Sequence, residues 1–94
     1  MTKHESSVFR LLSKKYTYSM LKKLEEGPKR FKDFSDVCKG EKMRSQRLRE
    51  FEKLSMVKVN LKREGRRAVS VYELSDIGRK TLKLAEDIRR LYGK

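Results

Sequence analysis

The sequence predicts a mainly helical α+β domain, and three observations support this fold class. Apolar residues recur at helical spacing before residue 55 and after residue 75, a period-2 alternation lies between them, and glycine or proline punctuates the helical part. The length of 94 residues allows one domain with a small core. We therefore treat residues 1–94 as one domain, with helices and a β-hairpin over about 6–74 and a terminal helix over 75–92.

The first two predicted helices are defined by apolar spacing and by their ends. Ser6 and Ser7 are expected to cap the first helix. The second helix covers residues 16–26. Gly27-Pro28 ends it, because glycine suits the C-terminal cap and proline cannot continue a helix.

A short helix, a glycine turn and a longer basic helix follow. Residues 31–38 carry apolar side chains at helical spacing, and Gly40 supplies the turn. The third helix covers residues 42–54, and its packing face consists of Met43, Leu48, Phe51 and Leu54. At 100° per residue the opposite face carries Lys42, Ser45, Gln46, Arg49 and Lys53. This order of elements is that of a helix-turn-helix.

A basic hairpin is predicted directly after the third helix. Val57, Val59 and Leu61 alternate with polar residues, which indicates a half-buried strand. The turn covers residues 63–66, where Gly65 is able to adopt a positive φ. A two-stranded ribbon is marginal alone, so it must pack on the helices. The combination predicts a winged helix-turn-helix, with a three-helix core and a two-stranded wing.

The terminal helix is predicted to run from Asp76 to about Tyr92, with Ser75 as its cap. Its apolar residues recur at alternating spacings of four and three, which fits a short coiled-coil seam. We expect a homodimer whose interface contains Val8, Leu12, Ile77, Thr81, Leu84, Ile88 and Leu91. The alternative is a helix that packs on its own domain, because Leu82 and Ala85 widen the stripe.

The charge of the chain indicates a polyanionic partner. The formal net charge is +13, and residues 42–67, with ten basic and three acidic residues, contribute +7 of it. Nucleic acid is the main candidate, and a merely solvated basic surface is the alternative. No apolar run approaches the ~20 residues of a membrane span. We expect a cytoplasmic protein of the nucleoid, and the scarcity of side-chain amides is typical of a thermophile.

No catalytic or cofactor site is expected. Cys38 is the only cysteine and His4 the only histidine, so neither a disulfide nor a multi-cysteine zinc site is available within the chain. The sequence contains no phosphate-binding glycine loop and no nucleophile with a matching base. We therefore predict a binding protein without a metal or cofactor, and not an enzyme.

Candidate DNA contacts fall into three groups. The recognition-helix group consists of Lys42, Arg44, Ser45, Gln46, Arg47, Arg49 and Lys53. Lys42, Ser45, Gln46 and Arg49 are expected at base edges. Arg44 is expected to extend outward toward a phosphate, and Arg47 and Lys53 are phosphate contacts or solubility charges. The wing group is Lys62, Arg63, Arg66 and Arg67. Arg30 and Lys32 are expected to clamp a phosphate with the amides of the short helix.

Three stretches, KYTYSMLKKLEEGPKRFKDF, SQRLREFEKLSMVKV and VSVYELSDIG, together resemble the HxlR family of winged-helix transcriptional regulators. The strongest parts are Gly27-Pro28 before Arg30-Phe31, the spacing of Leu48 and Phe51, and Tyr72-x-Leu74-Ser75-x-x-Gly78. The resemblance covers roughly residues 14–84. It implies a DNA-binding homodimer in which residues 42–54 recognise DNA, residues 57–74 form the wing, and the terminal helices form the dimer interface.

The chain departs from the family pattern at three positions. Tyr16 stands where the family commonly has tryptophan, Arg44 where it has leucine, and Ser55 where it has glycine. The N-terminal cysteine that serves redox sensing in some members has no match here. Thiol sensing is therefore not implied.

The function expected from these observations is sequence-specific binding of double-stranded DNA by a homodimer that regulates transcription. One alternative is an architectural nucleoid protein with little sequence preference, which the high charge favours. Another is a protein-interaction winged helix whose basic face binds acidic partners.

Overall fold

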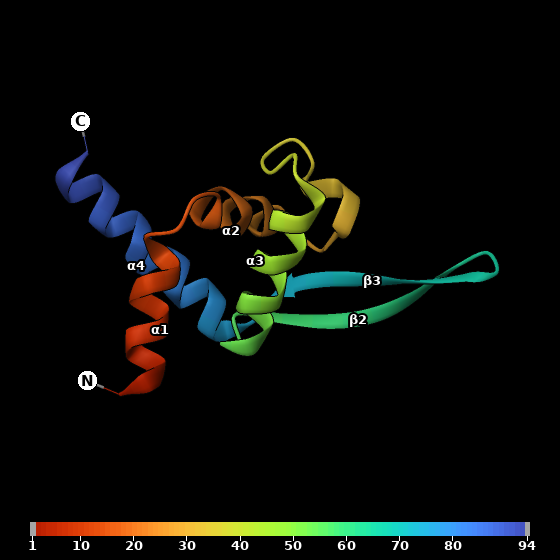
Figure 1. The fold of residues 1–94 in the computed structure, drawn as a ribbon, viewed down its shortest axis with the longest axis horizontal. Coiled ribbons are helices and arrows are strands. Elements are labelled where there is room, and N and C mark those ends of the chain that lie inside the picture. The colour runs from red at the N-terminus through yellow and green to blue at the C-terminus, as the bar shows by residue number, and fades with distance from the viewer. Residues whose placement is uncertain (1, 94) are drawn as a thin grey trace.

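The computed structural model describes residues 2–93 and has the predicted winged helix-turn-helix architecture. Figure 1 shows the hairpin projecting from the helical part as a long arm, while both termini lie on the opposite side. None of the described helices combines the length and the apolar composition of a membrane span. In chain order the elements are α1 (Lys3–Leu12), α2 (Thr17–Glu25), β1 (Lys29–Arg30), the 3₁₀ helix η1 (Phe31–Phe34), α3 (Glu41–Lys53), β2 (Val57–Glu64), β3 (Arg67–Leu74) and α4 (Asp76–Tyr92).

Helix α1 begins earlier than predicted, because Thr2 rather than Ser6 caps it. The Thr2 hydroxyl accepts a hydrogen bond from the Glu5 amide at 3.1 Å, and the Glu5 carboxylate accepts one from the Thr2 amide at 2.7 Å. This reciprocal capping box satisfies two amides at the start of the helix. The prediction of a start at Ser6 was wrong by one helical turn.

The predicted short helix over residues 31–38 is only the 3₁₀ helix η1. Phe34 is fully buried, and the chain after it continues in turns to the buried Cys38. Two residues before η1 form an additional strand, since Lys29 pairs with Tyr72 and Arg30 with Val71. The sheet is therefore three-stranded and antiparallel, in the order β1-β3-β2, where the sequence predicted two strands.

The hairpin has one face on the core and a free outer half. Val57 pairs with Leu74 and Val59 with Tyr72, and these four side chains pack on the helical core. Farther out, Leu61 is 76% exposed. The strands meet in a two-residue turn, where Gly65 has φ of +63° as predicted. The tip therefore projects beyond the core that anchors the base.

One junction fastens α3, β2 and α4 together. The Ser75 hydroxyl caps α4 by accepting from the Gly78 amide at 3.0 Å, as predicted, and donates to the Ser55 carbonyl at 2.5 Å. The Ser75 amide donates to the Met56 carbonyl at 3.0 Å. A Cβ on Gly78 would lie 2.0 Å from that same carbonyl oxygen, so only glycine fits.

We predict that Gly78→Ala destabilises the protein. The added methyl group meets backbone rather than a movable side chain, so we expect the free energy of unfolding to fall by about 3 kcal/mol. Urea denaturation followed by circular dichroism measures this change. Gly40→Ala is the control, since its Cβ has room at 4.0 Å from the nearest atom, and loses about 1 kcal/mol or less. Equal stability of the two variants would contradict the close approach.

Candidate nucleic-acid interface

Helix α3 exposes the face that the sequence predicts for DNA contact. Gly40 precedes the helix in an extended conformation, and Leu48 and Phe51 are buried on its inner side. Lys42, Gln46, Arg49 and Lys53 are exposed, and Ser45 is half-buried between them. The Arg49 guanidinium lies 3.4 Å from the Ser45 hydroxyl, one turn away. Their contact with DNA remains a prediction.

Arg44 does not extend outward, so this expectation was wrong. Its side chain is 5% exposed, and its guanidinium donates to the carbonyls of Cys38 at 2.9 Å and Lys39 at 3.0 Å. The guanidinium carbon also lies 4.7 Å from the centroid of the Phe31 ring. The turn before α3 leaves carbonyls without amide partners, and the planar guanidinium supplies several donors at once. Arg44 therefore holds the turn that precedes α3 against that helix.

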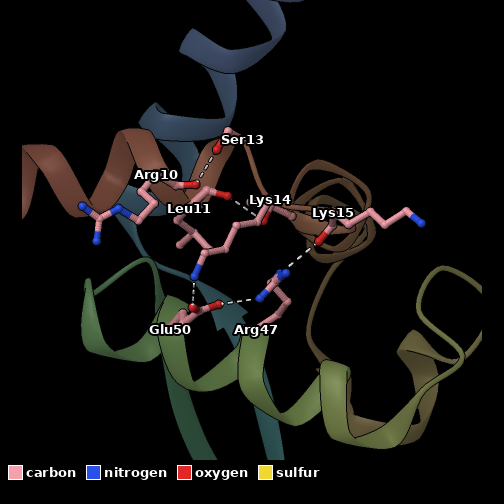
Figure 2. A network of polar contacts seen from close by, with 8 residues as sticks. Arg10, Leu11, Ser13, Lys14, Lys15, Arg47 and Glu50 are labelled. Carbon is pink, nitrogen blue, oxygen red and sulfur yellow. Dashed lines mark hydrogen bonds and ion pairs between the residues drawn. The ribbon is translucent and has the colours of Figure 1, made fainter.

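Arg47 likewise points inward, at the centre of the polar network in Figure 2. Its Nε donates to the Lys15 carbonyl at 2.9 Å, and its Nη1 donates to Glu50 at 2.9 Å. Lys14 binds the other Glu50 oxygen at 2.5 Å. Burial alone would raise the pKa of Glu50, but the hydrogen bonds from Lys14 and Arg47 outweigh it and lower the pKa. This placement does not fit the solvated or phosphate-binding role predicted for Arg47.

The wing carries exposed cations toward its tip. Lys62, Arg63, Arg66 and Arg67 are all exposed, and the arm that bears them projects away from the helices (Figure 1). Glu64 is the only acid among residues 62–67. Both of its oxygens accept from Nη1 of Arg30, at 2.6 and 2.8 Å. This ion pair joins strand β1 to the outer part of the wing.

Arg30 and Lys32 lie beside the wing rather than at the start of a regular helix. With Arg67 and Tyr72 they line a groove of about 410 Å³ between η1 and β3. Arg30 and Lys32 were predicted to clamp a phosphate together with the amides of a regular helix. That helix is absent, because η1 has only four residues, and the Arg30 amide already donates to Asp33 at 2.8 Å. Among residues 2–93, no acidic side chain forms an ion pair with the other two cations on this groove, Lys32 and Arg67.

Helices α1 and α4 form an apolar groove at the other end of the molecule. The groove has a volume of about 560 Å³, and its apolar lining consists of Val8, Phe9, Leu12, Leu84, Ile88 and Leu91, with Thr81 beside them. Leu84, Ile88 and Leu91 are 63%, 56% and 75% exposed. The groove thus brings together six of the seven residues that were predicted for the dimer interface. Ile77 is 56% exposed but does not line this groove.

Phe9 was not among the predicted interface residues. Phe9 is 63% exposed and lines the apolar groove, one position from Val8. The spacing of Val8, Phe9 and Leu12 on one side of α1 is the signal that identifies it. Within residues 2–93, no group of three or more His, Cys, Asp or Glu side chains is arranged to hold a metal ion.

Comparisons with known proteins agree with this architecture. Residues 11–92 match the model of the HxlR-like helix-turn-helix family. The diamide-treated YodB from B. subtilis is similar in structure with a TM-score of 0.82 and 26% identity, over 96% of this chain and 90% of that chain. The reduced form of that transcriptional regulator gives a TM-score of 0.80 at 26% identity, over 96% and 89% of the two chains.

A third structure, of the HTH-type protein ytcD, is similar with a TM-score of 0.77 and 22% identity, over 97% of this chain and 93% of that chain. A search of curated proteins finds no match. The family and these structural neighbours are transcriptional regulators and not enzymes. Because the family match covers nearly the whole chain, this protein belongs to the HxlR-like helix-turn-helix family of transcriptional regulators.

Proposed function

We propose that this protein regulates transcription by binding specific double-stranded DNA sites as a homodimer. The observation that carries the proposal is the exposed polar face of α3 beside a wing with four exposed cations. Each α3 would enter a major groove, with half-sites about one helical turn, ~34 Å, apart. The protein would act in the cytoplasm, at the nucleoid.

Base recognition is assigned to the exposed face of α3. Arg49 is suited to bidentate hydrogen bonding with guanine, and Gln46 with adenine. Ser45 lies close enough to Arg49 to orient its guanidinium. Lys53, near the end of the helix, is assigned to a flanking phosphate, and Lys42, which the sequence predicts at a base edge, lies in the first turn, where it would also reach a phosphate. Arg44 and Arg47 act indirectly, because their buried guanidiniums hold α3 in place.

Backbone contact is assigned to the wing and the groove beside it. Lys62, Arg63 and Arg66 reach beyond the folded core on the projecting arm, where they would meet phosphates or the minor groove. Lys32 and Arg67 line the groove next to η1. Arg30 is available to DNA only when it exchanges Glu64 for a phosphate. The wing would therefore set affinity more than sequence preference.

Dimerisation is assigned to the apolar groove between α1 and α4. An exposed apolar surface of this kind marks an interaction site on a soluble protein. The seam residues of α4 follow the heptad spacing, which a second copy of the same helix complements. Val8, Phe9 and Leu12 of α1 extend the surface. Ile77 lies on the same seam toward the start of α4.

An architectural role is the second candidate, and the formal charge of +13 favours it. Each phosphate that a protein neutralises adds a term to binding that depends on salt but not on sequence. Such a protein would coat DNA without a preferred site.

Selection of bound duplexes from a random pool tests the main proposal. We expect enrichment of one inverted repeat with half-sites about one turn apart. Arg49→Ala should cost about 1–3 kcal/mol and relax the preference at one base pair. Arg66→Ala should weaken binding to all sequences alike. It should also lower the salt slope, which is the steepness with which the logarithm of the binding constant falls with the logarithm of the salt concentration, by about one. No enriched site, with random and selected DNA bound equally, would favour the architectural role instead.

Matched variants at Arg44 and Lys42 distinguish a residue that holds α3 in place from a residue that contacts DNA. Arg44→Met leaves the Cys38 and Lys39 carbonyls without donors, so we expect the free energy of unfolding to fall by about 1–3 kcal/mol. The salt slope of DNA binding by the folded variant should not change. Lys42→Met should keep the stability and lower the slope by about one. A lower slope for Arg44→Met would show that Arg44 reaches a phosphate.

The dimer is tested by a charge placed in the apolar groove. Ile88→Glu introduces a carboxylate on the seam, and we expect it to shift the mass from about twice 11.2 kDa to 11.2 kDa in analytical ultracentrifugation. Leu61→Glu is the control, because Leu61 is equally apolar and 76% exposed but lies on the wing. This control should remain a dimer. A monomeric parent protein would rule out the proposed assembly.

A further inference from the structure

A third concave site, a cavity of about 460 Å³, opens between α1 and α3. Four cationic side chains line it, from Lys3, Arg10, Lys14 and Lys53, and its only carboxylate is that of Glu50. Its volume lies within the range of ~300–1,000 Å³ that is usual for sites of small molecules. The cavity contains no residue of the wing, and it shares only His4 with the apolar groove on the other side of α1.

The charge of the cavity is not balanced by the residues around it. The carboxylate of Glu50 is bound by Lys14 at 2.5 Å and by Arg47 at 2.9 Å. Among the residues that the structure describes, the side chains of Lys3, Arg10 and Lys53 form no ion pair with a carboxylate. Three cations therefore face a concave space without a counter-charge, which favours an anion there.

The walls of the cavity are partly apolar. Leu11 is buried and Leu54 is half-buried, and both line the cavity beside the cations. An inorganic anion would leave this apolar surface unused, whereas an organic anion would cover it. We propose that this cavity binds a small organic carboxylate, whose charged end lies against Arg10 and Lys14 and whose apolar part lies against Leu11 and Leu54.

The proposed dimer would leave this cavity accessible. Lys3, Ser7 and Arg10 follow one another at spacings of four and three, so they share one side of α1. Val8 and Leu12, which line the apolar groove, fall on the opposite side of the helix. A second copy seated on the groove therefore covers the other face of α1.

The occupant would touch the recognition helix. Glu50 and Lys53 belong to α3, and Figure 2 shows Lys14 reaching from the segment after α1 to Glu50, which also binds Arg47. A carboxylate on Lys14 competes with Glu50 for that ammonium group. Regulation of DNA binding by this route rests on the proposed function, whereas binding of the anion does not.

Titration of the full-length protein with benzoate, followed by ¹H–¹⁵N NMR in the absence of DNA, tests the site. We expect saturable shifts at Leu11 and Leu54. Acetate, which lacks the apolar part, and benzamide, which lacks the charge, should each bind at least about tenfold more weakly. Arg10→Gln should weaken benzoate binding by about tenfold, because it removes one charge-assisted hydrogen bond. Arg10 is exposed, so the variant should retain the fold and its thermal transition.

Arg79→Gln is the matched control, since Arg79 is exposed on α4, outside the cavity, and its loss changes the net charge equally. This control should bind benzoate as the parent protein does. Equal weakening in both variants, or shifts that do not saturate, would overturn the proposal. If Arg10→Gln instead lowers the salt slope of DNA binding by about one and benzoate does not bind, the cavity holds backbone phosphate and the proposal is also overturned. A failure to find a DNA site leaves the benzoate result unaffected.

Discussion

The placement of α3 depends on two buried guanidiniums. Leu48 and Phe51 provide an apolar contact along one side of the helix, but they do not fix its ends. Arg44 holds the turn before the helix through the Cys38 and Lys39 carbonyls, and Arg47 holds the α1–α2 connection through the Lys15 carbonyl. An arginine can satisfy several carbonyls while its charge is delocalised over a plane, so it tolerates such burial better than lysine. The opposite face of α3 remains free for a partner as a result.

Ion pairs join the helices of the molecule to one another, whereas few acids accompany the cations of the wing. On α2, Lys22 binds Glu25 and Glu86, and Lys23 binds Asp36. These ion pairs connect α2 to α4 and to the segment after η1. Residues 62–67 of the wing contain four exposed cations and one acid, Glu64, and Arg30 forms an ion pair with that acid. Residues 42–67 thus carry +7 of the formal charge of +13, and the rest of the chain carries the remaining +6.

Long periodic elements were predictable from the sequence, and short or long-range features were not. The β-hairpin and α4 extend over enough residues for their spacing to be read, and Ser75 was recognised as a cap. Strand β1 has two residues and no period of its own, so only its pairing with β3 defines it. The direction of Arg44 depends on carbonyls that the fold brings to it, and the helical wheel placed it only at the margin of the packing face. Thr2 and Glu5 did carry a capping signal, which the nearer serines obscured.

The contacts among Met56, Ser75 and Gly78 fix the direction in which α4 leaves the domain. The start of α4 is bonded to the Ser55 and Met56 carbonyls, in the short segment between α3 and β2, so the orientation of α4 is coupled to that of both elements. The 17 residues of α4 span about 25 Å, so a tilt of roughly 10° displaces the far end by about 4 Å. Two copies joined along α4 would transmit such a tilt as a change in the separation of their recognition helices. The first turn of α4 lies directly against the Met56 carbonyl because Gly78 has no side chain, and any larger residue there would change the angle at which α4 leaves the domain.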